Sequence, residues 1–234
     1  MITRVLALST AALLATVALA GCVRVDGPMS TETREIGAVT SVVLDTSGDV
    51  EITEGEPSLT IHAPENILDR LTSEVDDGVL ELGRSGGPMP FVTGEIRYEL
   101  TVESLDSLEL NGSGDITSSL AGDTFTIDIS GSGDVTIDGL AADSVDVVID
   151  GSGDVDLAGT ATALTIEIDG SGEVDADDLE VVDATVAIGG SGDAALHVTG
   201  TLAVDISGSG TVTHRGGAEV DSDVSGSGSV EEED

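Results

Sequence analysis

Carboxylates in a regular row are the residues of this chain best suited to chemistry. The tripeptide Gly-Ser-Gly occurs seven times in the second half, and in five copies an acidic residue stands two positions after the serine. The densest group within and beside this row comprises Asp150, Asp154, Asp156, Asp169, Glu173 and Asp175. Four of them, Asp150, Asp154, Asp169 and Glu173, are the most favoured as metal ligands. Carboxylate oxygens are the ligands that Ca²⁺ prefers. These four residues are therefore the candidate ligands of a calcium site, and no other cofactor is expected.

The same row has a second interpretation as a solvated acidic face. Unit charges at the roughly 4.8 Å spacing of adjacent strands repel by about 1 kcal/mol in water. Calcium-binding nonapeptide repeats also use glycine-rich turns, but they need an aspartate where this chain has Val155. The mismatch leaves both interpretations open.

No set of residues predicts catalysis. The histidines are His62, His197 and His214, and none has a nucleophile with a matching motif, since the serines of the Gly-Ser-Gly repeats lack the Gly-x-Ser-x-Gly spacing. Polysaccharide lyases share β-helical folds but generally need a basic residue, and Arg215 is the only arginine after Arg97. We therefore expect no catalytic residues, with a polysaccharide-acting enzyme as the least favoured alternative.

The N-terminus predicts export and a lipid anchor. A short positive segment precedes an apolar run at residues 5–20, which is the length of a signal-peptide core rather than of a membrane span. The run ends in Leu19-Ala20-Gly21-Cys22, which resembles the bacterial lipobox, in which Cys22 becomes the lipidated N-terminal residue. Cys22 is the only cysteine, so no disulfide can form within the chain. The alternative is a free cysteine after an ordinary signal peptide.

Composition excludes nucleic acid as a partner. The chain of 234 residues has 46 Asp and Glu against 7 Arg, a formal net charge of −39, and only one Tyr and two Phe. Binding to a polyphosphate requires basic side chains and stacking rings, which this chain lacks. The hydrophobic share of 39% is too high for a disordered chain and indicates a thin core of small β-branched residues.

The repeat itself predicts the elements that position the carboxylates. Its serines are separated by 18 to 20 residues, and apolar side chains occupy alternate positions on both sides, as in strands. A fixed period near 20 indicates a solenoid, with the inward-facing glycines at a corner or at a place where two walls of a narrow coil approach closely. A sandwich of hairpins explains the alternation but not the registered glycines. The turn glycines are Gly112, Gly114, Gly131, Gly133, Gly151, Gly153, Gly170, Gly172, Gly190, Gly192, Gly208, Gly210, Gly226 and Gly228.

The chain divides into five parts. Residues 1–21 are the signal peptide and residues 22–37 the lipidated cysteine with a polar tether. Residues 38–230 form the solenoid domain, with an irregular lead-in at 38–105 and regular repeats at 106–230. The lead-in contains strand-like runs, one short helix over residues 64–71, and a degenerate repeat copy at Ser47-Gly48-Asp49. Residues 231–234 are an acidic tail.

Between repeats, turns are expected at Asp138-Gly139, Ala158-Gly159, Thr199-Gly200 and Gly216-Gly217.

Three segments resemble a known family. Residues 47–52 (SGDVEI), 73–82 (SEVDDGVLEL) and 108–116 (LELNGSGDI), together with the lipobox, are similar to the head GIN domain family of auto-transporter adhesin heads. The resemblance implies an all-β, secreted or lipid-anchored β-helical domain without an established activity or catalytic residues. The chain lacks a barrel-like C-terminal segment of its own.

These observations together predict a non-enzymatic, lipid-anchored β-solenoid outside the cytoplasm. Its expected partners are the membrane, through the lipid, and an unidentified component of the cell envelope or a cell surface. A calcium-binding envelope protein is the alternative function.

Overall fold

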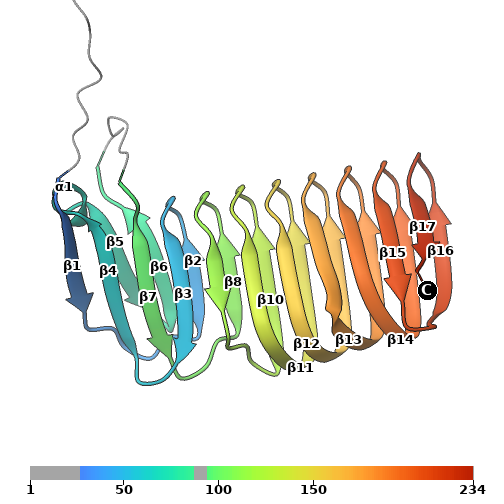
Figure 1. The fold of residues 1–234 in the computed structure, drawn as a ribbon, viewed down its shortest axis with the longest axis horizontal. Helices are drawn as coiled ribbons and strands as arrows, with labels where there is room; N and C mark the ends of the chain where they lie inside the picture. Colours follow the sequence, from blue (N-terminus) through green and yellow to red (C-terminus); the bar gives the residue numbers. More distant parts are fainter. Residues whose placement is uncertain (1–26, 87–93, 234) are drawn as a thin grey trace, which may run out of the picture.

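The chain folds into a single-chain β-solenoid, as the repeat predicts. A computed structural model describes residues 27–86 and 94–233, and within them it has seventeen strands and one short helix. Figure 1 shows the turns of the coil stacked side by side, with the two ends of the described chain at opposite ends of the long axis. The all-β class and the solenoid of about seven turns are thus confirmed.

The first half contains seven strands and the helix. The elements are β1 (Met29–Arg34), β2 (Ser41–Leu44), β3 (Asp49–Glu54), β4 (Ser58–Pro64), α1 (Glu65–Leu68), β5 (Leu71–Asp76), β6 (Val79–Arg84) and β7 (Arg97–Val102). The expected strands of the lead-in are present. The helix is shorter than predicted, because the chain passes into β5 at Leu71, within the predicted helical span.

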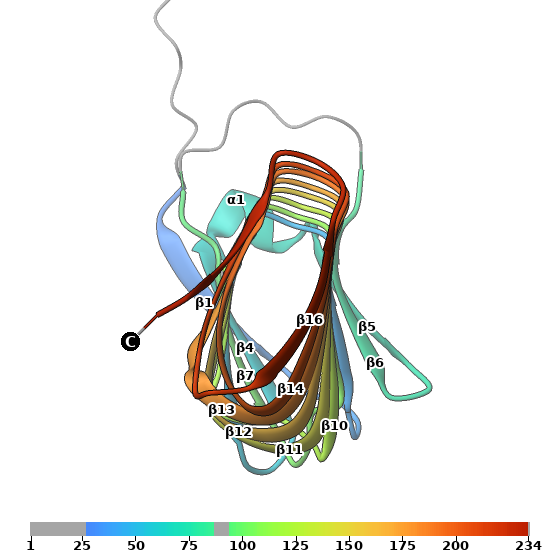
Figure 2. The same cartoon turned by 90° about the vertical axis from the view of Figure 1, so that its right-hand side faces the viewer.

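The second half contains the regular repeats. Its elements are β8 (Ser107–Leu110), β9 (Ile116–Ser118), β10 (Thr124–Ile129), β11 (Val135–Ile149), β12 (Val155–Ile168), β13 (Glu173–Ile188), β14 (Asp193–Ile206), β15 (Thr211–Arg215), β16 (Glu219–Val224) and β17 (Ser229–Glu232). Each Gly-Ser-Gly separates a strand that enters a turn from one that leaves it. Figure 2, viewed along the axis, shows these turns superimposed along one edge of the coil.

Two sheets face each other across the core. The entry sheet, made of the strands before the turns, runs β5, β6, β2, β8, β10, the second halves of β11–β14, then β16. The exit sheet, made of the strands after the turns, runs β1, β4, β7, β3, β9, the first halves of β11–β14, then β15 and β17. Pairing is parallel except for β5–β6, β1–β4 and β4–β7.

The core is narrow, as the shortage of aromatic residues indicates. Inward side chains such as Ile127, Ile129, Val135 and Ile137 are fully buried, and their outward neighbours are not. Apart from Tyr98 and Phe125, the buried hydrophobic side chains of the described residues are aliphatic, and Thr46, Ser118 and His214 are buried polar residues beside them. Thin walls of β-branched residues suit strands that pack at the usual spacing of about 10 Å between sheets.

The turn glycines are required because a side chain would not fit at these positions, and not because of their backbone angles. None of the fourteen has a positive φ. A Cβ atom built on each would lie 1.8–2.4 Å from a backbone carbonyl oxygen of the preceding turn. The predicted close approach therefore exists, but it is between successive turns along the axis and not between opposite walls.

Three of the four expected return turns differ from the prediction. Asp138-Gly139, Ala158-Gly159 and Thr199-Gly200 lie inside β11, β12 and β14, which bend without ending. Local shifts in register absorb the bends, as β-bulges do in other curved sheets. Only Gly216-Gly217, with φ of 103° and 79°, lies between two strands.

The predicted tether is in part a strand. β1 lies within residues 22–37 and pairs antiparallel with β4. Arg34 anchors it, donating hydrogen bonds to the Leu71 carbonyl oxygen at 3.0 Å and to Ser73 Oγ at 2.9 Å. The polar side chains of this segment predict a tether, whereas the segment forms a strand that supplies backbone partners for the open edge of β4. Similarly, Glu231 and Glu232 of the predicted tail belong to β17.

The lead-in builds both a turn of the coil and its cap. β2 and β3 flank the degenerate copy at Ser47-Gly48-Asp49 and pair in register with β8 and β9. The chain then turns away through β4, α1, β5 and β6, and β7 returns along the other side of β3. Ile67 and Leu68 of α1 are buried against this end of the core.

Candidate functional site

The acidic row is a ladder of hydrogen bonds along the exit sheet. The backbone N–H of Asp134 donates to Asp115 Oδ1 at 3.0 Å, and that of Asp154 donates to Asp134 Oδ1 at 3.0 Å. The N–H of Glu173 donates to Asp154 Oδ1 at 2.9 Å. Each carboxylate therefore accepts the first peptide N–H after the next turn, which is a charge-assisted bond.

The ladder starts one turn earlier than the regular repeats. The N–H of Asp115 donates to Asp49 Oδ1 at 3.2 Å, across 66 residues of sequence. Asp49 was not among the candidate residues. The sequence did contain a signal for it, because Ser47-Gly48-Asp49 repeats the motif.

The ladder changes toward the C-terminal end. Asp193, which follows the longer side chain of Glu173, donates its N–H to the Gly172 carbonyl oxygen at 3.3 Å instead. Asp193 Oδ1 in turn accepts the N–H of Thr211 at 2.6 Å. The next residue in the row, Ser229, donates its N–H to the Gly210 carbonyl oxygen at 3.2 Å. The last turns thus use backbone acceptors where an aspartate is missing.

The four candidate calcium ligands are not gathered into one site. Asp150 and Asp169 stand before their turns, whereas Asp154 and Glu173 stand after them. In the described part of the chain, no three Asp, Glu, His or Cys side chains are close enough to hold a metal ion. Asp154 Oδ1 is also already engaged by the N–H of Glu173. The arrangement fits a structural role for the carboxylates better than the predicted coordination.

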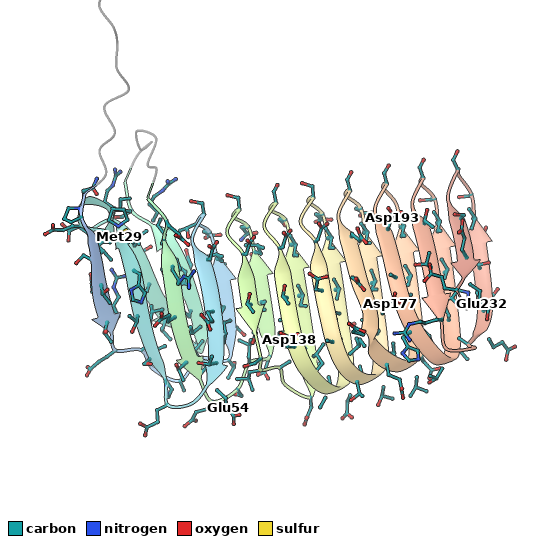
Figure 3. All side chains as sticks on the ribbon, in the orientation of Figure 1. Met29, Glu54, Asp138, Asp177, Asp193 and Glu232 are labelled. Carbon is teal, nitrogen blue, oxygen red and sulfur yellow. The ribbon has the colours of Figure 1, made fainter. Side chains whose placement is uncertain are left out.

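A shallow pit of about 130 Å³ lies further down the exit sheet. Four carboxylates surround it, from Asp138, Asp156, Asp175 and Asp178. Figure 3 labels Asp138 and Asp177 near the lower end of this face and Asp193 close to the turns. Partial burial, reinforced by Asp175 and other neighbouring carboxylates, raises the pKa of Asp156. The fold therefore holds this carboxylate in a position that disfavours its ionised form.

Glu173 and Asp128 experience the same crowding. Desolvation, then the charges of Asp154 and Asp193, raise the pKa of Glu173. Desolvation, then the charge of Glu109, raises the pKa of Asp128 on the entry sheet. Both shifts mean that the folded protein favours the protonated carboxyl more than an isolated side chain does.

The histidines lie at three separate places in the fold. His62 of β4 contacts Thr31 Oγ1 at 3.1 Å and Glu99 Oε1 at 3.3 Å, near the cap. His197 is half-buried in β14, and His214 is buried in β15, in agreement with the alternation. Each is in a different strand, and the structure does not bring them together. Cys22 lies outside the described residues.

The sequence matches one protein-family model over most of the domain. Residues 38–218 match the model described as "Putative auto-transporter adhesin, head GIN domain". The chain belongs to the head GIN domain family. The match begins just before β2 and ends just before β16, so it leaves out β1 and the last turn of the solenoid. The curated proteins compared with this head GIN chain show no significant match to it.

Solved structures share the fold. A "putative adhesin" from Bacteroides fragilis has a TM-score of 0.84 at 23% identity, covering 88% of this chain and 97% of its own. A "putative lipid binding protein" from Parabacteroides distasonis has a TM-score of 0.73 at 22% identity, covering 89% and 98%. A "putative adhesin" from Parabacteroides merdae has a TM-score of 0.71 at 24% identity, covering 89% and 98%. At these identities the likeness establishes the solenoid fold and no function.

The described residues of this head GIN chain include no helix with the length and apolar character needed to cross a membrane.

Proposed function

We propose that this chain is a non-enzymatic module that displays a β-solenoid for contacts at the outside of the cell envelope. The lipobox Leu19-Ala20-Gly21-Cys22 carries the proposal, because it combines export with anchoring. Membership of an adhesin-head family supports an extracytoplasmic binding role. The ladder gives the carboxylates a structural use, which supports a binding or structural role over catalysis.

The anchor sets the orientation of the coil. Six residues separate Cys22 from Met29, where β1 begins. At about 3.5 Å per extended residue, such a segment reaches about 20 Å at most. The capped end of the coil therefore stays near the membrane. The last turn, which is at the opposite end in Figure 1, points away from the membrane.

The anchor is tested by replacing the lipidated residue. In cells fed a labelled fatty acid, wild-type protein is expected in the membrane fraction with label, and Cys22→Ser in the soluble or secreted fraction without it. Ser30→Ala, outside the lipobox, is the control and should behave as wild type. A Cys22→Ser protein that still fractionates with membranes would disprove the anchor.

The binding role is tested separately by cross-linking on intact cells. The proposal expects a reproducible cross-linked envelope or cell-surface component. If the chain instead releases new reducing or unsaturated ends from envelope polysaccharide, it is an enzyme and the display role is wrong.

A further inference from the structure

The last turn of the coil has two unpaired strand edges. β16 pairs with β14, and β17 with β15, each on one side. Within residues 27–86 and 94–233, nothing pairs with their other sides. At the opposite end, β1 and β5 are the edge strands, and Ile67 and Leu68 of α1 are buried against the core.

The hydrogen-bond pattern shows which backbone groups point outward at this edge. Inward-facing residues donate their N–H to the following turn, as Ile116 does to the Asp134 carbonyl oxygen and Val135 to that of Asp154. Val230 occupies the corresponding position in β17, and no described turn follows it. The same alternation directs the N–H groups of Val220 and Val224 away from β14. The edge therefore offers a row of donors and acceptors for one more parallel strand.

The side chains of this turn also lack a cover. Val220 and Val224 are 37% and 40% exposed, whereas Leu202 and Ile206, one turn earlier in the same columns, are 1% and 0% exposed. One further strand with apolar side chains facing inward would bury these two valines as the last turn buries the residues before it.

The charges decide which strand fits. The outward side chains of the turn include Glu219, Asp221 and Asp223 in β16 and Glu231 in β17. A second copy of this acidic edge would place like charges opposite one another, which disfavours pairing. A strand with cationic residues at its outward positions would instead place opposite charges side by side. The carboxylates thus exclude most strands and select basic ones.

A pit beside the edge fits a long cationic side chain. It has a volume of about 210 Å³ and lies on the entry sheet over the small residues Ala187 and Ala203. Asp205, Asp221 and Asp223 line it as well. A Lys or Arg side chain can lay its aliphatic stem on an apolar floor while its charge meets carboxylates.

We propose that the last turn accepts an extended cationic segment of another protein by strand addition, with basic residues alternating with small apolar ones. This is peptide recognition by β-augmentation. The inference deepens the proposed display function and rests on it for its biological setting, since the acceptor edge is at the end distant from the anchor.

The test uses the full chain in non-ionic detergent and a synthetic peptide of four Lys-Val repeats at about 0.15 M salt. Its control is the same peptide with the backbone nitrogen of every lysine methylated. This change keeps the side-chain charge but removes the backbone N–H groups that would face β16 in a parallel ladder. We expect at least tenfold weaker binding of the control. We also expect slower hydrogen exchange at Val220 and Val224 when the unmodified peptide is bound.

Matched variants localise the site. Val220→Pro removes an outward N–H of β16 and should weaken binding, whereas Val220→Thr retains it and should not. Asp221→Asn/Asp223→Asn should weaken binding more than Asp76→Asn/Asp77→Asn, which changes the charge equally in the β5–β6 hairpin at the other end.

Three results would overturn the proposal. Equal binding of both peptides would show that the acidic surface merely attracts polycations. Exchange protection on the exit sheet alone would place the site elsewhere. Dimers of the unliganded chain, formed through the last turn and seen by sedimentation, would make a second copy the occupant. None of these results depends on Cys22, so failure here leaves the anchoring proposal intact.

Discussion

Glycine and aspartate stabilise each turn of the coil in different ways. The glycines let the backbone of one turn lie directly on the carbonyl oxygens of the turn before. The aspartates accept the N–H that follows, so that the row of turns is bonded by side chains as well as by backbone. A conformational explanation would fail for these glycines, because their φ values are ordinary.

Gly153→Ala should destabilise the protein strongly. Its Cβ would lie 2.0 Å from the Gly133 carbonyl oxygen, so the turn must shift, at a cost of about 2–4 kcal/mol. Gly37→Ala is the control, because its Cβ meets nothing within 4 Å and its φ is ordinary. Urea titrations of the two variants would measure their free energies of unfolding and so test this prediction. Equal stability of the two variants would refute the steric explanation.

Asp134→Asn and Asp134→Ala should change the stability of the protein in opposite directions. The asparagine oxygen can still accept the N–H of Asp154, while the loss of charge relieves repulsion along the row. Alanine loses the acceptor, and we expect it to be less stable than the asparagine variant by about 1 kcal/mol. Thermal unfolding at low salt would measure this difference. If the two variants unfold together, the hydrogen bond contributes nothing.

Among the elements, the regular strands could be predicted and the capped end only in outline. Alternating Val, Ile and Leu around registered glycines determine the strands of the repeats, and the core residues Ile127 and Ile149 follow from the same alternation. The position of β1 could not be predicted, because its partner β4 is 30 residues away and its own side chains are polar. The pairing of β7 beside β3 likewise depends on long-range contacts without a sequence period.

For the candidate site, the sequence predicted which carboxylates share a row but not what they bind. The residue period places Asp115, Asp134 and Asp154 in one column. Their hydrogen bonds to the next turn depend on the axial rise and the side-chain rotamer, which the period does not contain. The four predicted calcium ligands stand on both sides of the turns, and among the described residues no three carboxylates are close enough to hold a metal ion.

The exit sheet should make stability depend on pH. Desolvation and neighbouring carboxylates raise the pKa of Asp156 and Glu173. Carboxyls with a higher pKa in the folded state contribute stability that is fully present below their ordinary pKa of about 4 and is lost as the pH rises through the raised values. We therefore expect the free energy of unfolding to increase as the pH falls from neutral through the raised pKa values toward the ordinary value of about 4.

The matched variant for this effect is Asp156→Asn/Glu173→Gln, which cannot titrate at these two positions. Its stability should increase less than that of wild type over the same pH range, as urea titrations at each pH would show. Parallel pH profiles for the two proteins would show that these residues are not responsible.

For the whole molecule, the net charge of −39 governs the response to salt. Self-repulsion destabilises a highly charged folded chain, and salt screens it over about 10 Å at 0.1 M. We expect the melting temperature to rise as NaCl is increased from about 0.05 M to about 1 M. A fall in melting temperature would show that attractive ion pairs outweigh the repulsion.

The same measurement separates screening from a calcium site. CaCl₂ and MgCl₂ at equal concentration should raise the melting temperature similarly, because the described carboxylates form no group that could hold a metal ion. A rise specific to calcium, lost in Asp154→Asn/Glu173→Gln, would establish calcium binding after all.

The position of β2 and β3 affects how the chain can fold as it emerges N-terminus first. These strands are made early, yet β2 lies between β6 and β8, and β3 between β7 and β9, all of which are made later. They must wait for about 60 further residues before both their edges are occupied, whereas each later turn can join a finished template as soon as it appears. Synthesis order and spatial order therefore agree in the repeats and disagree in the cap, so the slow, non-local step of folding comes first.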